Sequence, residues 1–271
     1  MTDHKFDPFG FSSVPFSENE KTPFLDISRE QVIKRMQSFL NYRGFAVLSG
    51  APGTGKTMLL NHLCRSLQPN EHRIIYIPFA MLKPADMLKS ICLKLDLEPT
   101  VSTTKMLRSI QDRISEIQPV NPVLVVDEIQ KISHPTLEVI RLMTNFNFEE
   151  KNLFSIVMVG NDEFLQQLKL RLNEPLRQRI TCFQRLSVLS REDTKKYIKH
   201  HFETAGAHHE VITEQAASLV YDLTSGTPRL INSLVFASLE EAADAGSKII
   251  DLDHINTSNE LVSLPAQEVF Q

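Results

Sequence analysis

The segment from Gly50 to Thr57 reads GAPGTGKT and matches the pattern G-x-x-x-x-G-K-[ST] at every fixed position. Glycines at this spacing let successive backbone N–H groups converge on phosphate oxygens, and a following helix adds the partial positive charge of its N-terminus. Lys56 can reach the β- and γ-phosphates of a nucleotide, and Thr57 can ligate Mg²⁺. The expected contacts to ATP are Gly50, Pro52, Gly53, Thr54, Gly55, Lys56, Thr57 and Met58.

A second motif, which is acidic, supplies the groups that the phosphate loop lacks. The apolar run 123–126 is followed by Asp127-Glu128, where Asp127 can hold Mg²⁺ and Glu128 can orient or deprotonate an attacking water. An acidic pair that merely ends a strand in solvent is the alternative. Its position after a complete phosphate loop favours the second half of an ATP-hydrolysing site, with ATP and Mg²⁺ as cofactors.

Further polar residues have candidate roles, each with a structural alternative. Asn161 follows a later apolar strand and can position the lytic water or cap a helix. An arginine of the segment 176–180, Arg177 or Arg179, can reach a neighbouring subunit's γ-phosphate or lie solvated. Arg229 lies in the first turn of a helix, where a cation is mildly disfavoured unless an anionic ligand is near. The histidine pairs at 200–201 and 208–209 are interpreted as solvated surface, since neighbours on a helix point to different faces.

The elements that must position these residues alternate between strand and helix. Apolar strands and helices with i, i+3, i+4 spacing predict an α/β fold: a parallel sheet of about five strands, buried on both faces by helices. Because the phosphate motif falls between such a strand and such a helix, a chance Gly-rich turn is disfavoured. The expected strands are 44–49, 73–78, 123–126, 154–159 and 182–186; the expected helices are 28–40, one after the loop, a helical region 84–117, and 136–146.

After Leu189 the pattern is helical only. Ser190 and Thr213 are expected N-caps, and Thr227-Pro228 opens a further helix. We therefore expect a small helical lid domain. The predicted organisation is an N-terminal arm at 1–25, an ATP-binding α/β domain at 26–187, the lid at 188–260 and a tail at 261–271. The aromatic residues of the arm are interpreted as hooks that tie it to the core, or as a wall around the adenine base.

Composition narrows the class of protein. A hydrophobic share of 42% and a charged share of 23% are typical of a soluble globular protein. No signal peptide or run of transmembrane length is found, so a cytoplasmic location without membrane contact is expected. The three cysteines are interpreted as buried thiols. A net charge of −4 excludes a protein that binds nucleic acid through its overall charge.

Together these motifs resemble those of the AAA+ ATPases. Residues 50–57 correspond to Walker A, 123–128 to Walker B, Asn161 to sensor one, Arg179 to the arginine finger, with Arg177 as second choice, and Arg229 to sensor two. More narrowly, the chain is similar to the ExeA/TnsC/TniB group. That resemblance depends on Phe9-Gly10-Phe11 with Pro15-Phe16, on Gln178-Arg179-Ile180, and on the segment 226–232, GTPRLIN.

The group resemblance implies an ATP-dependent homo-oligomer, as a ring or helical filament. A chain of this size without an evident membrane span favours the transposition regulators. These assemble on duplex DNA without strong sequence preference and recruit or activate a transposase or targeting protein. The alternative is an ExeA-like secretion or envelope ATPase that acts on protein partners. The expected DNA contacts are Lys83, Thr103 and Lys105, in a stretch with six cations against four acids.

Overall fold

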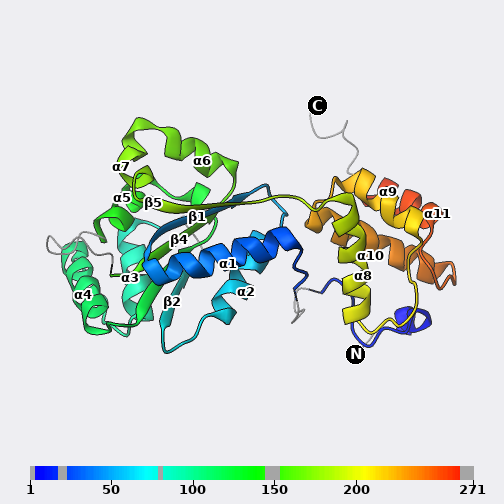
Figure 1. The fold of residues 1–271 in the computed structure, drawn as a ribbon, viewed down its shortest axis with the longest axis horizontal. Helices are drawn as coiled ribbons and strands as arrows, with labels where there is room; N and C mark the ends of the chain where they lie inside the picture. Colours follow the sequence, from blue (N-terminus) through cyan, green and yellow to red (C-terminus); the bar gives the residue numbers. More distant parts are fainter. Residues whose placement is uncertain (1–3, 18–22, 79–81, 144–152, 263–271) are drawn as a thin grey trace. The chain divides into compact units, whose positions relative to one another are not determined.

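The computed structural model describes residues 4–17, 23–78, 82–143 and 153–262. The chain divides into two compact units (Figure 1). The first, here called the helical unit, comprises residues 1–26, 53–55 and 187–271. The second, here called the sheet unit, comprises residues 27–52 and 56–186. The expected tail beyond residue 262 and the expected helix end at 144–146 lie outside the described residues.

A five-stranded sheet forms the centre of the sheet unit, and its strand order is β2-β3-β4-β1-β5. Every pair of neighbouring strands is parallel, which confirms the predicted parallel α/β sheet. The boundaries differ from the expected ones by up to two residues, with the last strand beginning at Ile180 rather than 182. The strands are β1 (Gly44–Gly50), β2 (His72–Ile77), β3 (Asn121–Val126), β4 (Ser155–Gly160) and β5 (Ile180–Leu186).

Helices cover both faces of this sheet. One set of alternating strand residues, including Phe45 and Val47, packs in a single apolar cluster with side chains of α3 to α7. α1 contacts β1 and β5, and α2 contacts β1 and β4. The helices are α1 (Ile27–Tyr42), α2 (Lys56–Ser66), α3 (Pro84–Lys94), α4 (Thr103–Glu116), α5 (His134–Met143), α6 (Asp162–Lys169) and α7 (Glu174–Arg177), with short 3₁₀ turns η2 (Ile129–Lys131) and η3 (Arg171–Asn173).

The strand register determines where the polar motifs meet. Ser49 pairs with Gly160, and Ile77 pairs with Val126. The carboxyl ends of β1, β3 and β4 therefore lie at one edge of the sheet. The phosphate loop, Asp127 and Asn161 each follow one of these strand ends, so parallel pairing brings distant sequence segments to a common edge.

The helical unit contains α8 to α11. Ser190 and Thr213 accept backbone N–H groups at the starts of α8 and α9, which confirms both predicted caps. Thr227 occupies the N-cap position of α10, but its side chain makes no capping bond. The helices are α8 (Arg191–Thr204), α9 (Glu214–Thr224), α10 (Pro228–Asp244) and α11 (Leu252–Val262), with η1 (His4–Phe9) at the start of the chain.

The N-terminal arm packs against these helices. Phe9 is fully buried in the apolar cluster formed by α8 to α11. The ring of Phe16 stacks on His201 with centroids 4.7 Å apart, and Phe24 meets Tyr197 edge-on at 5.5 Å. The interpretation of these aromatics as hooks is therefore the one that the packing favours, and the structure they hold is the helical unit.

The prediction of three buried thiols is correct for one cysteine. Cys92 is buried, but Cys64 and Cys182 are only half-buried, because each lies at the margin of a helix or edge strand.

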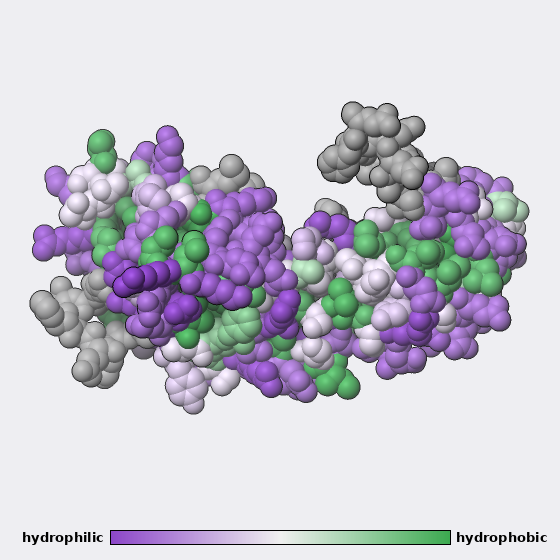
Figure 2. Space-filling model, turned by 90° about the horizontal axis from the view of Figure 1, so that it is seen from above, coloured by the Kyte–Doolittle hydropathy of each residue, from purple (hydrophilic) through white to green (hydrophobic). Residues whose placement is uncertain are grey.

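Within the described residues, no helix combines the length and apolarity that a membrane span requires. On the face in Figure 2, hydrophilic and hydrophobic residues are interspersed over both units.

Candidate nucleotide site

The phosphate loop joins the end of β1 to the start of α2. Gly53 and Gly55 have φ values of +79° and +91°, which side-chain-bearing residues rarely adopt. Lys56 is the first residue of α2 and only 9% exposed. Its ammonium donates to the carbonyls of Gly50 (2.9 Å) and Ala51 (3.0 Å). A triphosphate would offer charged acceptors, which form stronger bonds with an ammonium than these neutral carbonyls do.

Two hydroxyl groups converge on Asp127, which is buried at the end of β3. Thr57 Oγ1 donates to Asp127 Oδ2 at 3.0 Å, and Tyr76 Oη donates to the same oxygen at 3.3 Å. Burial, and secondarily the neighbouring Asp127, raises the pKa of Tyr76 to about 12. A threonine hydroxyl beside a carboxylate is an oxygen donor set that suits Mg²⁺. The residues present therefore fit the expected metal.

Tyr76 was not anticipated from the sequence. Its side chain interacts with the site because β2 pairs with β3, which places Tyr76 opposite Val125, two residues before Asp127. The only available signal was a tyrosine near the end of a predicted strand, and strand order is not visible in a single sequence.

Glu128 and Asn161 are joined through a residue that the sequence analysis did not single out. Glu128 has a left-handed backbone conformation, with φ +52°. Its Oε2 accepts from Gln130 Nε2 at 2.9 Å and lies 3.2 Å from the Lys131 ammonium. The backbone N–H of Asn161 donates to Gln130 Oε1 at 3.3 Å. The side chain of Asn161 caps α6, since its Oδ1 accepts from the N–H of Glu163 at 3.0 Å.

The three candidate arginines lie in different surroundings. Arg179 is half-buried and donates to the carbonyl of Arg141 at 3.2 Å; burial and the nearby Arg141 lower its pKa. Arg177 ends α7 with a side chain 48% exposed, 3.9 Å from Glu174. Arg229 is the second residue of α10, and its N–H donates to the Gly53 carbonyl at 3.2 Å. Arg229 and Gly53 both belong to the helical unit.

The candidate DNA contacts are exposed at the starts of two helices. Lys83 is the N-cap of α3, while Thr103 and Lys105 open α4. The end of α3 meets the start of β2, where the Arg73 guanidinium donates to the Lys94 carbonyl at 2.7 Å. α4 ends shortly before β3 begins. Both helices thus run toward the amino ends of the strands, so their first turns lie toward the carboxyl edge of the sheet.

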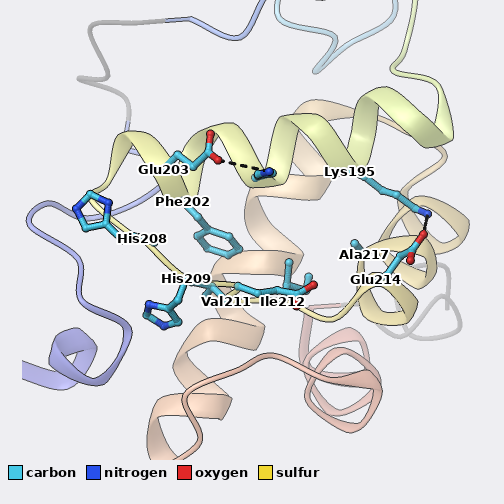
Figure 3. Close-up of a pocket in the computed structure, with 12 residues that line it drawn as sticks. Lys195, Phe202, Glu203, His208, His209, Val211, Ile212, Glu214 and Ala217 are labelled. Carbon is cyan, nitrogen blue, oxygen red and sulfur yellow. Dashed lines mark hydrogen bonds and ion pairs between the residues drawn. The ribbon is translucent and has the colours of Figure 1, made fainter.

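A separate groove of about 810 Å³ lies in the helical unit, between α8, the segment 207–212 and α9 (Figure 3). Its lysines are already paired: Lys195 with Glu214 at 2.9 Å, and Lys199 with Glu203 at 3.7 Å. His208 and His209 line the same groove. Among the described residues no cluster of histidine, cysteine and carboxylate side chains suited to a metal ion is found.

Comparison with known proteins places this geometry in a family. Residues 40–168 match the protein-family model described as "AAA domain". Residues 40–168 therefore form an AAA domain, and the fold is that of the AAA+ ATPases. The same fold is found in Cdc6p from Pyrobaculum aerophilum, with a TM-score of 0.74, 20% identity, and coverage of 91% of this chain and 70% of that one. Drosophila ORC bound to DNA gives a TM-score of 0.70, with 20% identity and coverage of 96% and 66%.

A curated relative extends the comparison beyond the AAA+ domain. "General secretion pathway protein A" of Aeromonas hydrophila is 32% identical to this chain, over 96% of its length. The chain spans about half of that relative, 48% of its residues. The similarity to an ExeA-like protein therefore has support, whereas membership of the TnsC- or TniB-type regulators is not shown.

Proposed function

We propose that this AAA+ domain binds and hydrolyses Mg²⁺-ATP to drive a secretion- or envelope-associated assembly through protein partners. The proposal of ATP hydrolysis rests on the 3.0 Å hydrogen bond between Thr57 and Asp127, because Thr57 directly follows Lys56 in the sequence. Lys56 binds the β- and γ-phosphates, and Thr57 and Asp127 hold the metal, which neutralises charge on those phosphates when bound. Glu128 accepts a proton from the attacking water. Asn161 contacts the phosphates from the end of β4. Arg229 does so beside Gly53 of the phosphate loop, to whose carbonyl its N–H donates.

The choice of protein partners follows the 32% identity to general secretion pathway protein A, which covers nearly the whole of this chain. The net charge of −4 agrees with this choice, because an acidic protein has no general attraction for nucleic acid. Protein partners are proposed for this chain by analogy with that relative, because the chain matches only 48% of the relative's length.

The catalytic assignment is tested by Glu128→Gln. This variant retains the metal ligands and loses the base, so ATP affinity should stay within about twofold while the hydrolysis rate falls by about a hundredfold or more. Turnover is measured by phosphate release, and binding by titration with a fluorescent ATP analogue. Hydrolysis at the wild-type rate would remove Glu128 from the mechanism.

A DNA-assembling role, serving a transposase or targeting protein, is the second candidate. It is favoured by Lys83 and Lys105, which are exposed at helix starts directed toward the same sheet edge, and by the likeness to ORC, solved bound to DNA. Duplex DNA binding with a non-hydrolysable ATP analogue at low salt separates the candidates. The secretion proposal predicts no ATP-dependent binding. The DNA proposal predicts binding that weakens as salt rises.

Matched variants identify the surface if DNA is bound. Lys83→Ala/Lys105→Ala should then weaken binding to all sequences alike. Lys89→Ala/Lys94→Ala removes the same charge from later turns of α3 and is the control. Equal losses in both pairs would indicate a general charge effect rather than a contact surface.

We further propose that the site is completed by an arginine of a neighbouring subunit. Arg177 is better suited than Arg179 to reach out of its own chain, because it is exposed and its pairing with Glu174 is long, whereas Arg179 donates to Arg141. Mixing Arg177→Ala subunits with Lys56→Ala subunits should restore ATPase activity, since each supplies what the other lacks. Recovery with Arg179→Ala instead would assign the role to Arg179. No recovery with either, together with a monomer in ATP, would contradict a shared site.

A further inference from the structure

We propose that Gln130 is a positioning residue for ATP hydrolysis, and that it fixes the Glu128 carboxylate relative to the end of β4. This inference rests on the proposed function, because Glu128 must be the group that activates water. Gln130 lies in η2, immediately after the acidic motif, and the sequence pattern gave it no role.

The side chain of Gln130 is held at both ends. Its Nε2 donates to Glu128 Oε2 at 2.9 Å, and its Oε1 accepts the N–H of Asn161 at 3.3 Å. Its own backbone carbonyl accepts from Gln167 Nε2 of α6 at 2.9 Å. The residue thereby connects the water-activating carboxylate, the carboxyl end of β4 and the first helix after it.

A side-chain amide suits this bridge. An ionised carboxylate accepts hydrogen bonds and a backbone N–H donates them. A side chain between these two groups must therefore donate at one end and accept at the other. Glutamine does so, glutamate would place two acceptors against the Glu128 carboxylate, and lysine would have no acceptor for Asn161.

The fold leaves room for the bridge at Gly160. A Cβ at this position would lie 2.6 Å from Ile129 Cγ2 and 2.9 Å from Gln130 Oε1. Both distances are well inside van der Waals contact, so any side chain at Gly160 would displace η2 or the Gln130 amide. The glycine at the end of β4 is thus part of the same arrangement.

Glu128 needs such an anchor because little else restrains it. Its side chain is 44% exposed and its φ of +52° is unusual for a residue with a Cβ. The ion pair with Lys131 joins two exposed groups, and such pairs contribute little. Both contacts fall on Oε2, which leaves Oε1 to take the proton from water. Small errors in the position of a base are costly to rate, and a misplacement of about 1 Å can cost about a hundredfold.

The test uses Gln130→Met, which keeps the length and loses both polar ends, and Gln130→Glu, which keeps the acceptor and loses the donor. Gln130 is half-buried near the surface, so the isosteric Gln130→Glu should fold even if the methionine variant does not. For both we expect kcat to fall about tenfold or more, with the KM for ATP and the affinity for a fluorescent ATP analogue within about twofold. Lys131→Ala, which removes the other contact to Glu128, is the control and should change kcat by less than about threefold.

A double-mutant cycle assigns the effect to Glu128. In the Glu128→Gln background, Gln130→Met should change the residual rate by less than about twofold, because the group being positioned is already gone. An equal loss in both backgrounds, a wild-type rate in both Gln130 variants, or a faster rate in either would overturn the inference. If Glu128→Gln hydrolyses ATP normally, the proposed function fails as well. If Glu128→Gln is slow and the Gln130 variants are normal, only the inference about Gln130 fails.

Discussion

The carboxyl edge of the sheet and the surface of the helical unit are both rich in polar residues, but those residues are used differently. At the sheet edge, Thr57 and Tyr76 converge on one buried carboxylate, and Lys56, which precedes Thr57 in the sequence, is only 9% exposed. On the helical unit, each lysine of the groove is paired with a carboxylate that is well exposed, Lys195 with Glu214 and Lys199 with Glu203. Exposed pairs of this kind contribute at most about 1 kcal/mol. Convergence of polar groups, rather than their number, therefore distinguishes a site from a solvated face.

The two regions also differ in what fills their interiors. The core of the sheet unit is built from the strands and the helices between them. The core of the helical unit includes residues from the other end of the chain, with Phe6 and Phe9 of the arm buried among α8 to α11. The helical unit therefore depends in part on a long-range contact from the N-terminus.

Removing one lysine from each region tests whether convergence, rather than charge alone, makes the sheet edge a nucleotide site. Lys56→Ala should abolish measurable ATP binding, a loss of at least about a thousandfold, because the phosphates lose their main cation. Lys199→Ala removes the same charge from the groove and should leave ATP affinity unchanged. Titration with a fluorescent ATP analogue measures both. Equal losses would mean that overall charge, not convergence, governs binding.

The dependence of the helical unit on the arm is tested by Phe9→Ala. Removing a fully buried ring leaves a cavity, so the free energy of unfolding should fall by about 3–5 kcal/mol. Phe183→Ala is the control, since this ring on edge strand β5 is 49% exposed, and its loss should cost less than about 1.5 kcal/mol. Chemical denaturation measures both, and a cost below 1 kcal/mol for Phe9→Ala would contradict the role of the arm.

Loss of the Tyr76 hydroxyl, one of the two that contact Asp127, should have a smaller effect on the metal site. Tyr76→Phe removes one of the two hydroxyls on Asp127, so the carboxylate is less well oriented for the metal. We expect the half-saturating Mg²⁺ concentration to rise about three- to tenfold in hydrolysis, and Mn²⁺ affinity measured by electron paramagnetic resonance to fall in parallel. Tyr42→Phe, at a side chain 84% exposed, is the control. Unchanged Mn²⁺ affinity would show that Thr57 and Asp127 suffice.

The smallest expected effect concerns Cys64 on α2. Burial raises the pKa of this thiol to about 11, whereas an unfolded cysteine titrates near 8.5. Between these values the unfolded chain binds fewer protons than the folded one, so stability falls as pH rises through this window. These two pKa values alone would correspond to a loss of about 2 kcal/mol in the free energy of unfolding by pH 10. Because Cys64 is only half-buried, solvent screening reduces the expected loss to about 1 kcal/mol. Cys64→Ala should lack that portion of the decline, and identical pH profiles for the two proteins would refute it.

Much of the fold was predictable because its determinants are local. Apolar strands alternating with amphipathic helices require a covered parallel sheet, and the observed sheet agrees. The caps at Ser190 and Thr213 were equally predictable, since a cap depends on residues within one turn. The half-buried state of Cys64 and Cys182 was not, because hydrophobic periodicity does not say how far a helix or strand lies from the edge of its layer.

The phosphate loop and the acidic motif are apparent from the amino-acid sequence alone, since each is a contiguous segment whose chemistry depends on its own spacing. The contact of Tyr76 with Asp127, and the bridge that Gln130 makes from Glu128 to the backbone of Asn161, arise only in the folded chain. These contacts depend on which strands are neighbours and on their register. Register is settled by the packing of whole strands, so it is encoded in the entire sheet and not in any one segment.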